Sequence, residues 1–170
     1  MKTILFLACS IDGQIARSDD SVSWGDDVWR NYYEFCNEVG ALLVGRRTYE
    51  LMAQSPELTH LKLQTLGIVT QTLASPPSRT ALFPSHRAAL QHCQAAGYQR
   101  VVIGGGTTLA HSLLEDDLLD EVQLDIEPKI YGAGIPMFRR IDQERGLELL
   151  ETRKSGAHTV RVHYRIKKRG

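Results

Sequence analysis

Four short apolar segments without polar interruption punctuate the first two thirds of the chain. They are Ile4–Ala8, Ala41–Val44, Leu66–Val69 and Val101–Ile103. Continuous apolar runs of this length are typical of strands that are buried on both faces, as in a parallel sheet covered by helices. Segments with helical periodicity separate them. The pattern therefore predicts an α/β fold of three layers, α/β/α, around a mostly parallel central sheet.

Two of the intervening segments carry the signals that begin and end helices. Over Asp26–Val39, apolar residues recur at spacings of three and four, which places them on one helix face. Ser85–Ala96 begins with a residue that is a good N-cap. Each segment is followed by a glycine, the usual residue after the last turn of a helix. Two shorter helices are expected after Gly45 and Gly106.

The pattern changes after Asp120. Over residues 122–127, Val, Leu and Ile alternate with Gln, Asp and Glu, which predicts a strand with one wetter face. Leu147–Arg153 and Thr159–Lys167 form an expected antiparallel hairpin around Ser155-Gly156. The sheet is therefore predicted to be mixed, within a single domain spanning 1–170.

Composition narrows the possible partners. The 170 residues carry 20 Lys and Arg against 20 Asp and Glu, so the basic surface expected of a nucleic-acid-binding protein is missing. Small molecules are the expected ligands. The three cysteines, Cys9, Cys36 and Cys93, are odd in number and widely spaced, which predicts neither a disulfide framework nor a metal site and fits a reducing cytoplasm. No apolar run approaches the roughly 20 residues that span a bilayer.

The strongest candidate for chemistry is Gly104-Gly105-Gly106, between the apolar run that ends at Ile103 and a predicted helix that begins with Thr107-Thr108. Glycines let the main chain approach a ligand closely, and a helix N-terminus offers unpaired N–H groups to a phosphate. The segment lacks the full G-x-G-x-x-G spacing, and three glycines also make an ordinary tight turn. Taken alone, this segment does not distinguish a phosphate-binding turn from an ordinary tight turn.

A second strand-to-helix junction repeats this logic with charge added. Arg46 or Arg47, after Gly45, can bind a phosphate with two parallel hydrogen bonds, and Thr48 offers a hydroxyl in the first helical turn. The alternative is that the arginines are solvated and that Thr48 caps the helix. Two such junctions in one sheet predict one bound dinucleotide. Thr70-Gln71 forms a third polar rim at the end of a strand.

Taken in order, several segments resemble the dihydrofolate-reductase-like superfamily, in particular the C-terminal reductase domain of the bacterial bifunctional riboflavin-biosynthesis deaminase-reductase and its stand-alone relatives. The resemblance covers nearly the whole chain. It is carried by Ser10–Ala16, Trp24, Gly45–Tyr49, Val102–Leu109, Leu119–Pro128 and Gly132–Phe138.

The resemblance implies NADPH as the hydride donor, held across the carboxyl edge of the sheet. By position, Arg46 or Arg47 would bind the adenosine 2′-phosphate and Thr48 the pyrophosphate. Thr70 or Gln71 would lie beside the adenine ribose. The stretch from Ile103 through Gly104, Gly105, Gly106, Thr107 and Thr108 would wrap the diphosphate and the nicotinamide end, and Ala8 would contact the nicotinamide. A cis peptide is implied between Gly104 and Gly105.

The substrate side carries fewer matches. Asp12 and Trp24 are expected to line it, with Asp12 the first candidate for proton delivery and Asp27 the second. Riboflavin-pathway reductases commonly carry an acidic residue where Gly104 stands, and another where Met52 stands. Both acids are absent here.

The sequence therefore predicts an NADPH-dependent reductase of a small polar heterocycle, of the pterin or ribosylamino-pyrimidine type. The alternative is a non-catalytic, dimeric dinucleotide-binding protein that keeps the fold. The resemblance also implies a homodimer, for which the C-terminal hairpin and the Asp120–Glu127 strand are the candidate contacts.

Overall fold

The computed structural model describes residues 1–73, 75 and 77–169. The domain expected over 1–170 thus includes residues 74, 76 and 170, which lie outside this description. Among the described residues, no helix is both long enough and apolar enough to cross a membrane. In chain order the elements are β1 Lys2–Ser10, β2 Gln14–Arg17, α1 Asp26–Val39, β3 Ala41–Gly45, α2 Arg46–Ala53, α3 Glu57–His60, β4 Thr65–Val69, β5 Ala81–Phe83, α4 His86–Ala95, β6 Arg100–Ile103, α5 Thr107–Glu115, β7 Glu121–Glu127, β8 Gly134–Pro136, β9 Leu147–Lys154 and β10 Val160–Ile166.

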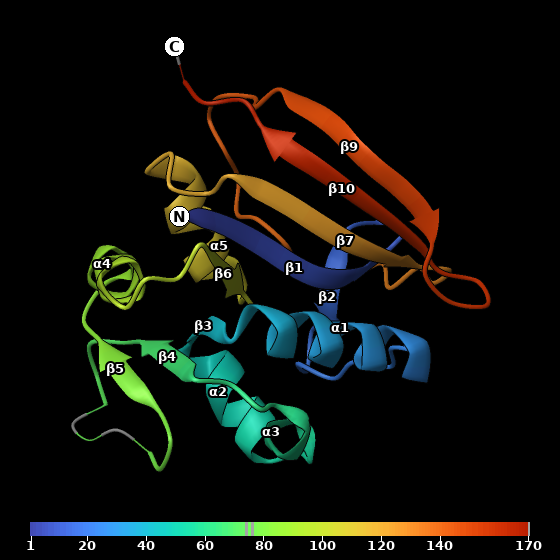
Figure 1. Cartoon of the computed structure of the whole chain (residues 1–170). Coiled ribbons are helices and arrows are strands. Elements are labelled where there is room, and N and C mark those ends of the chain that lie inside the picture. The colour runs from blue at the N-terminus through green and yellow to red at the C-terminus, as the bar shows by residue number, and fades with distance from the viewer. Residues whose placement is uncertain (74, 76, 170) are drawn as a thin grey trace.

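The main sheet has the strand order β5-β4-β3-β6-β1-β7-β10-β9 (Figure 1). Neighbours from β5 to β7 run parallel, whereas β10 runs antiparallel to β7 and β9 antiparallel to β10. The mixed sheet and the C-terminal hairpin are thus confirmed. The short β2 and β8 pair with each other beside the main sheet, and the sequence pattern predicted neither.

Both faces of the central strands are buried, as their unbroken apolar runs predict. On one face, Leu43 and Ile103 pack with residues of α4 and α5. On the other, Leu42, Val44 and Val102 pack with residues of α1 and α2. Alternate residues of one strand therefore enter two separate cores, which gives the three-layer arrangement in Figure 1.

The two long helices have their predicted bounds or nearly so. α1 spans Asp26–Val39 and ends at Gly40, whose φ of 78° is left-handed. α4 begins after Ser85, whose side chain accepts a hydrogen bond from the Ala88 amide at 3.2 Å. These are the capping interactions that the sequence indicated.

The expectation of a wetter face on β7 is wrong. Its polar residues are the buried ones, with Gln123 only 6% and Asp125 0% exposed. These residues are buried because the neighbouring strand β10 places side chains of opposite charge on the same face of the sheet. Arg161 donates to Asp125 through Nε at 2.8 Å and through Nη2 at 2.6 Å, and His163 pairs with Glu121 at 2.9 Å. Alternation of polar and apolar residues shows that a strand has two different faces. It does not show whether the polar face is buried against residues of opposite charge.

The last carboxylate of this face, Glu127, ties β7 to the start of α1. It accepts hydrogen bonds from the Gly25 amide at 3.1 Å and from Lys129 Nζ at 3.1 Å, and a further one from the Thr159 hydroxyl. Burial opposes ionisation of Glu127, but the hydrogen bonds from Thr159, Lys129 and Gly25 outweigh burial and lower its pKa. The first turn of α1 is thereby fixed to the sheet.

Acid should weaken the fold through Glu121 and Glu127, because the pKa values of both lie below the ordinary 4.5. A carboxylate with a lowered folded-state pKa stabilises the protein above its unfolded-state pKa, and this stabilisation is lost as the pH falls through the lower folded-state value. We expect the free energy of unfolding in urea to fall steeply below pH 4.5. Glu127→Gln should flatten this fall and cost about 1–3 kcal/mol at pH 7.

Glu144→Gln is the matched control, since Glu144 is exposed and lies outside the hairpin. It should change neither the slope nor the stability at pH 7. Equal acid profiles for wild type and Glu127→Gln would contradict the assignment.

Candidate functional site

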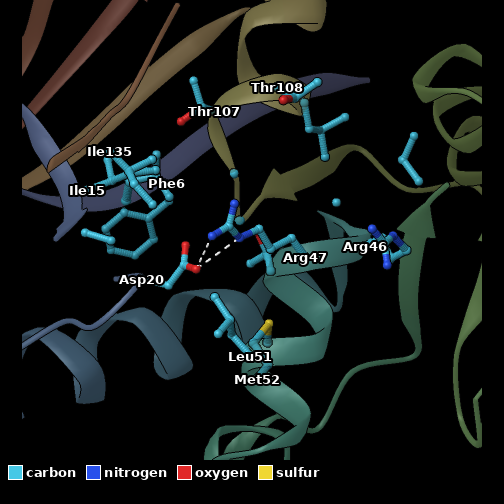
Figure 2. Close-up of a pocket in the computed structure, with 18 of the residues that line it drawn as sticks. Phe6, Ile15, Asp20, Arg46, Arg47, Leu51, Met52, Thr107, Thr108 and Ile135 are labelled. Atoms are coloured by element: carbon cyan, nitrogen blue, oxygen red, sulfur yellow. Dashed lines mark hydrogen bonds and ion pairs between the residues drawn. The ribbon is translucent and has the colours of Figure 1, made fainter. Parts of the chain in front are cut away.

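A cavity of about 960 Å³ opens at the carboxyl edge of the sheet. Its sheet-side wall consists of residues at the ends of β1, β3 and β4 and of the turn that follows β6. Residues of α1 and α2 close it from one side and the start of α5 from the other (Figure 2). This is the edge at which open α/β sheets bind their ligands.

The two glycine junctions converge in this cavity. The Gly45 amide donates to the Gly105 carbonyl at 2.9 Å, and the Gly104 amide donates to the Leu43 carbonyl at 2.9 Å. The first turns of α2 and α5 therefore begin side by side. A Cβ placed on Gly106 would lie 3.2 Å from Thr48 Oγ1, so the two junctions are closely packed against each other.

Most of the residues predicted to bind the cofactor share the cavity wall. Two do not. Ile103 is fully buried in the core beneath α4 and α5, since its side chain points to the opposite face of β6. Gly105 uses its carbonyl for the bond with Gly45. The predicted residues that line the cavity are Ala8, Gly45, Arg46, Arg47, Thr48, Thr70, Gln71, Gly104, Gly106, Thr107 and Thr108.

The cis peptide lies one bond later than expected. It joins Gly105 to Gly106 rather than Gly104 to Gly105. Gly105 has a φ of 96°, which an L side chain rarely adopts, so the turn requires glycine at this position.

Both candidate arginines are already paired with carboxylates. Arg47 Nε lies 3.1 Å from Asp20 Oδ2, and Arg46 Nη1 lies 2.8 Å from Glu50 Oε1. Figure 2 shows Arg47 reaching toward Asp20 across the cavity, while Arg46 extends to its other side. Both arginine side chains are about half exposed or more, and ion pairs of this kind contribute only about 0–1 kcal/mol. A phosphate group can therefore compete for either guanidinium.

The two predicted catalytic carboxylates do not reach the cavity. Asp12 accepts hydrogen bonds from the amides of Tyr131 at 3.1 Å and Gly132 at 2.7 Å, so it holds the loop before β8. Hydrogen bonds with Ser10 and Tyr131 lower the pKa of this exposed carboxyl, which makes it a poor proton donor. Asp27 is ion-paired with Arg30.

The position of Asp27 follows from the phase of α1. Val28, Trp29 and Tyr32 face the cavity, and each residue turns the helix by about 100°, so Asp27 lies to the other side of Val28. There it packs against Gly156 in the β9–β10 turn. The structure thus places both candidates for proton delivery, Asp12 and Asp27, outside the cavity lining.

Trp24 does line the cavity, as expected for a residue on the substrate side. Its ring stacks on Tyr131 with centroids 5.4 Å apart. Together with Phe6, Ile15 and Ile135 it forms an apolar wall; Figure 2 shows these last three grouped at one end of the cavity. A flat ring of modest polarity fits such a wall.

Several polar residues of the cavity were not singled out from the sequence, among them Tyr32, Asp125 and Glu57. Tyr32 was counted only as part of the apolar stripe of α1, and Asp125 only as part of the expected wet face of its strand. Glu57 lies in the short α3, which no periodicity revealed; burial raises its pKa. Asp125 is the cross-strand neighbour of Ala8, and Arg161 neutralises its charge. Among the described residues, no cluster of three His, Cys, Asp or Glu side chains could hold a metal ion.

Known proteins share this fold. A protein from Shewanella sp. PV-4, provisionally assigned to riboflavin biosynthesis, has a crystal structure that superposes with a TM-score of 0.83 over 99% of this chain and 100% of its own, at 19% identity. That likeness concerns the fold. YwjB of Bacillus subtilis, an uncharacterised protein, is 28% identical over 169 residues, 96% of this chain and 97% of its own.

A third relative has a named activity. The 2,5-diamino-6-ribosylamino-4(3H)-pyrimidinone 5′-phosphate reductase of Methanothermobacter thermautotrophicus is 25% identical over 172 residues, covering 76% of this chain and 79% of its own. The model of the RibD C-terminal domain family matches residues 1–161. With the strand order and the paired glycine junctions, this match shows that the chain belongs to the RibD C-terminal domain family, a family of reductases with the dihydrofolate-reductase-like fold.

Proposed function

We propose that this protein is an NADPH-dependent reductase of a small polar heterocycle, of the pterin or ribosylamino-pyrimidine type. The observation that carries the proposal is the hydrogen bond between Gly45 and Gly105, which brings two helix N-termini to one cavity edge. Helix N-termini present unpaired N–H groups and the positive end of the helix dipole, so a diphosphate is the ligand that they favour.

The residues at this edge fit the cofactor in detail. The backbone at Gly106 lies open to a ligand because it carries no side chain, and Thr48 Oγ1 lies beside it. Arg46 and Arg47 stand at the start of α2 as partners for the 2′-phosphate, with Thr70 and Gln71 further along the edge. When bound, NADPH supplies a hydride to the substrate.

The protein itself contributes the positioning of the two reactants and an apolar surface. Ala8 offers a small side chain at the junction between the phosphate edge and the apolar wall. The wall, with Trp24 and Trp29, suits the flat face of a heterocycle and excludes water from it. Holding two reactants in one orientation lowers the barrier even in a site without a charged catalytic group. The three cysteines are free and buried, which fits a reducing cytoplasm.

The alternative is a dinucleotide-binding protein without turnover. It is favoured by one observation, namely that neither Asp12 nor Asp27 reaches the cavity. The two functions differ in turnover and not in affinity for the cofactor.

Turnover is measured as NADPH consumption at 340 nm, a wavelength set by the nicotinamide. The substrates are dihydrofolate, 5-amino-6-(5-phosphoribosylamino)uracil and 2,5-diamino-6-ribosylamino-pyrimidinone 5′-phosphate. We expect consumption with at least one pyrimidine. NADPH binding without consumption across the panel would favour the alternative, and no NADPH binding would contradict both.

Preference for NADPH should depend on the two arginines. Replacing Arg46 and Arg47 together by Ala should raise the Kd for NADPH about ten- to a hundredfold, since charged hydrogen bonds to a phosphate are lost, and should barely change the Kd for NADH. Arg100→Ala is the control, because Arg100 pairs with Glu38 at the opposite edge of the sheet. Equal losses for the two cofactors would remove the 2′-phosphate role.

We also propose that the protein forms a homodimer through its C-terminal hairpin. β9 is exposed along its whole length, and its Leu147 and Leu149 are 47% and 53% exposed. These two leucines lie opposite Ile166 and Tyr164 of β10, so they extend one apolar face of the sheet. Exposed leucines grouped on an edge strand are typical of a contact surface.

Light scattering after gel filtration tests the dimer. Replacing Leu147 and Leu149 together by Asp should convert a dimer to a monomer. Ile130→Asp should not, although Ile130 is 76% exposed, because it lies outside the hairpin. A wild-type monomer at micromolar concentration would contradict the proposal.

A further inference from the structure

Two successive arginines begin α2, at the end of a helix where a cation is poorly placed. Arg46 and Arg47 occupy its first turn, which holds no acidic residue. The N-terminus of a helix carries the positive end of the helix dipole, so each guanidinium there needs a counter-charge from outside the turn. The two arginines obtain this counter-charge in different ways.

Arg46 is paired within its own helix. Its Nη1 lies 2.8 Å from Glu50 Oε1, one helical turn further on, and both side chains are exposed. Exposed pairs between residues four apart in a helix are weak. Figure 2 shows Arg46 extending away from Phe6 and Ile135 of the apolar wall. Its guanidinium can therefore leave Glu50 for a phosphate at that end of the cavity.

Arg47 is paired across the cavity instead. Its Nε lies 3.1 Å from Asp20 Oδ2, and its Nη2 contacts the same oxygen. Asp20 belongs to the loop between β2 and α1, whose Val22 and Trp24 also line the cavity. The pair therefore joins the wall formed by this loop to the wall formed by α2 (Figure 2). In the part of the chain that the structure describes, no other hydrogen bond or ion pair links this loop to α2.

The carboxylate is the fixed half of this pair. Asp20 has a φ of 68°, and its amide donates to the Arg17 carbonyl at 3.0 Å, while the Arg17 amide donates to the Ser21 carbonyl at 2.9 Å. Aspartate is among the few residues other than glycine that adopt this left-handed conformation readily. The Asp20 side chain is 18% exposed, against 69% for Arg47. Opening the pair thus needs only a swing of the arginine side chain.

The rest of the loop is anchored on its own side of the cavity. Arg17 Nη2 donates to Ser23 Oγ at 2.9 Å, and the Trp24 ring stacks on Tyr131. These contacts do not involve α2, so they persist when Arg47 moves. The loop therefore presents the Asp20 carboxylate as a preformed anchor.

We propose that the two arginines have separate roles: Arg46 alone discriminates the 2′-phosphate, and the Asp20–Arg47 pair is a strap that controls how fast ligands enter and leave. The inference rests on the proposed function and deepens it, since that function assigns the 2′-phosphate to both arginines. A strap that does not touch the ligand closes the empty and the occupied cavity alike. It therefore slows entry and exit by the same factor and leaves affinity unchanged.

Stopped-flow fluorescence measures both rate constants, since Trp24 and Trp29 line the cavity and report its occupation. Arg47→Ala and Asp20→Asn should each raise the association and dissociation rate constants about threefold, for NADPH and NADH alike. Both Kd values should stay within about twofold, as expected for the loss of one exposed ion pair that does not touch the ligand. Asparagine is chosen because it tolerates the left-handed turn.

Arg46→Ala separates the two roles. It should raise the Kd for NADPH about tenfold through faster dissociation, and leave both rate constants of NADH within about twofold. Arg30→Ala is the matched control, because it removes an exposed arginine pair of the same kind, with Asp27, outside the cavity lining. It should leave the rate constants of both cofactors unchanged.

The two hypotheses for Arg47 predict opposite results. If Arg47 bound the 2′-phosphate, Asp20→Asn would release it and tighten NADPH, whereas Arg47→Ala would weaken NADPH and spare NADH. Either result would overturn the inference, as would unchanged rate constants in both variants or unequal changes in association and dissociation. Absence of NADPH binding to wild type would instead reject the proposed function, and the inference with it.

Discussion

The close approach of two chain crossings is the constraint on which this molecule depends. The amide of Gly45 reaches the carbonyl of Gly105, and a Cβ on Gly106 would lie 3.2 Å from Thr48 Oγ1, a tight contact. The φ of 96° at Gly105 favours glycine in this turn, and the contact between the junctions brings both helix N-termini to one edge. The parallel pairing of β3 with β6 holds the two junctions next to each other. The glycines and the sheet topology therefore favour the same arrangement.

Around that edge, charge is balanced locally. Arg47 faces Asp20 in an exposed, exchangeable pair, whereas Arg161 and Asp125 form a pair that is almost completely buried. The first kind of pair contributes little stability and opens readily to an anion. The second is held by its geometry, and removing one partner would leave an uncompensated charge in the interior. The same cavity therefore has an exchangeable ion pair at its rim and a buried, fixed ion pair at its base.

Much of this arrangement could be predicted from the sequence, because the information was local. Apolar runs revealed the parallel strands, and glycines marked the two junctions. What failed depended on partners far away in the chain. The polar face of β7 is buried because Arg161 comes from another strand. Asp27 misses the cavity through the phase of its helix. Tyr32 was predicted only as one of the apolar residues of α1, and its place beside Gly104 depends on how that helix packs on the sheet.

The burial of Asp125 also bears on how the chain acquires its shape during synthesis. β7 pairs with β1, an early strand of the chain, but the buried Asp125 of β7 finds its cation, Arg161, only on β10, which follows much later. A nascent chain that has not yet released β10 from the ribosome would hold Asp125 beside the cavity without a counter-charge. The ligand-binding half of the molecule therefore reaches its final form only when the two ends of the chain have joined in one sheet.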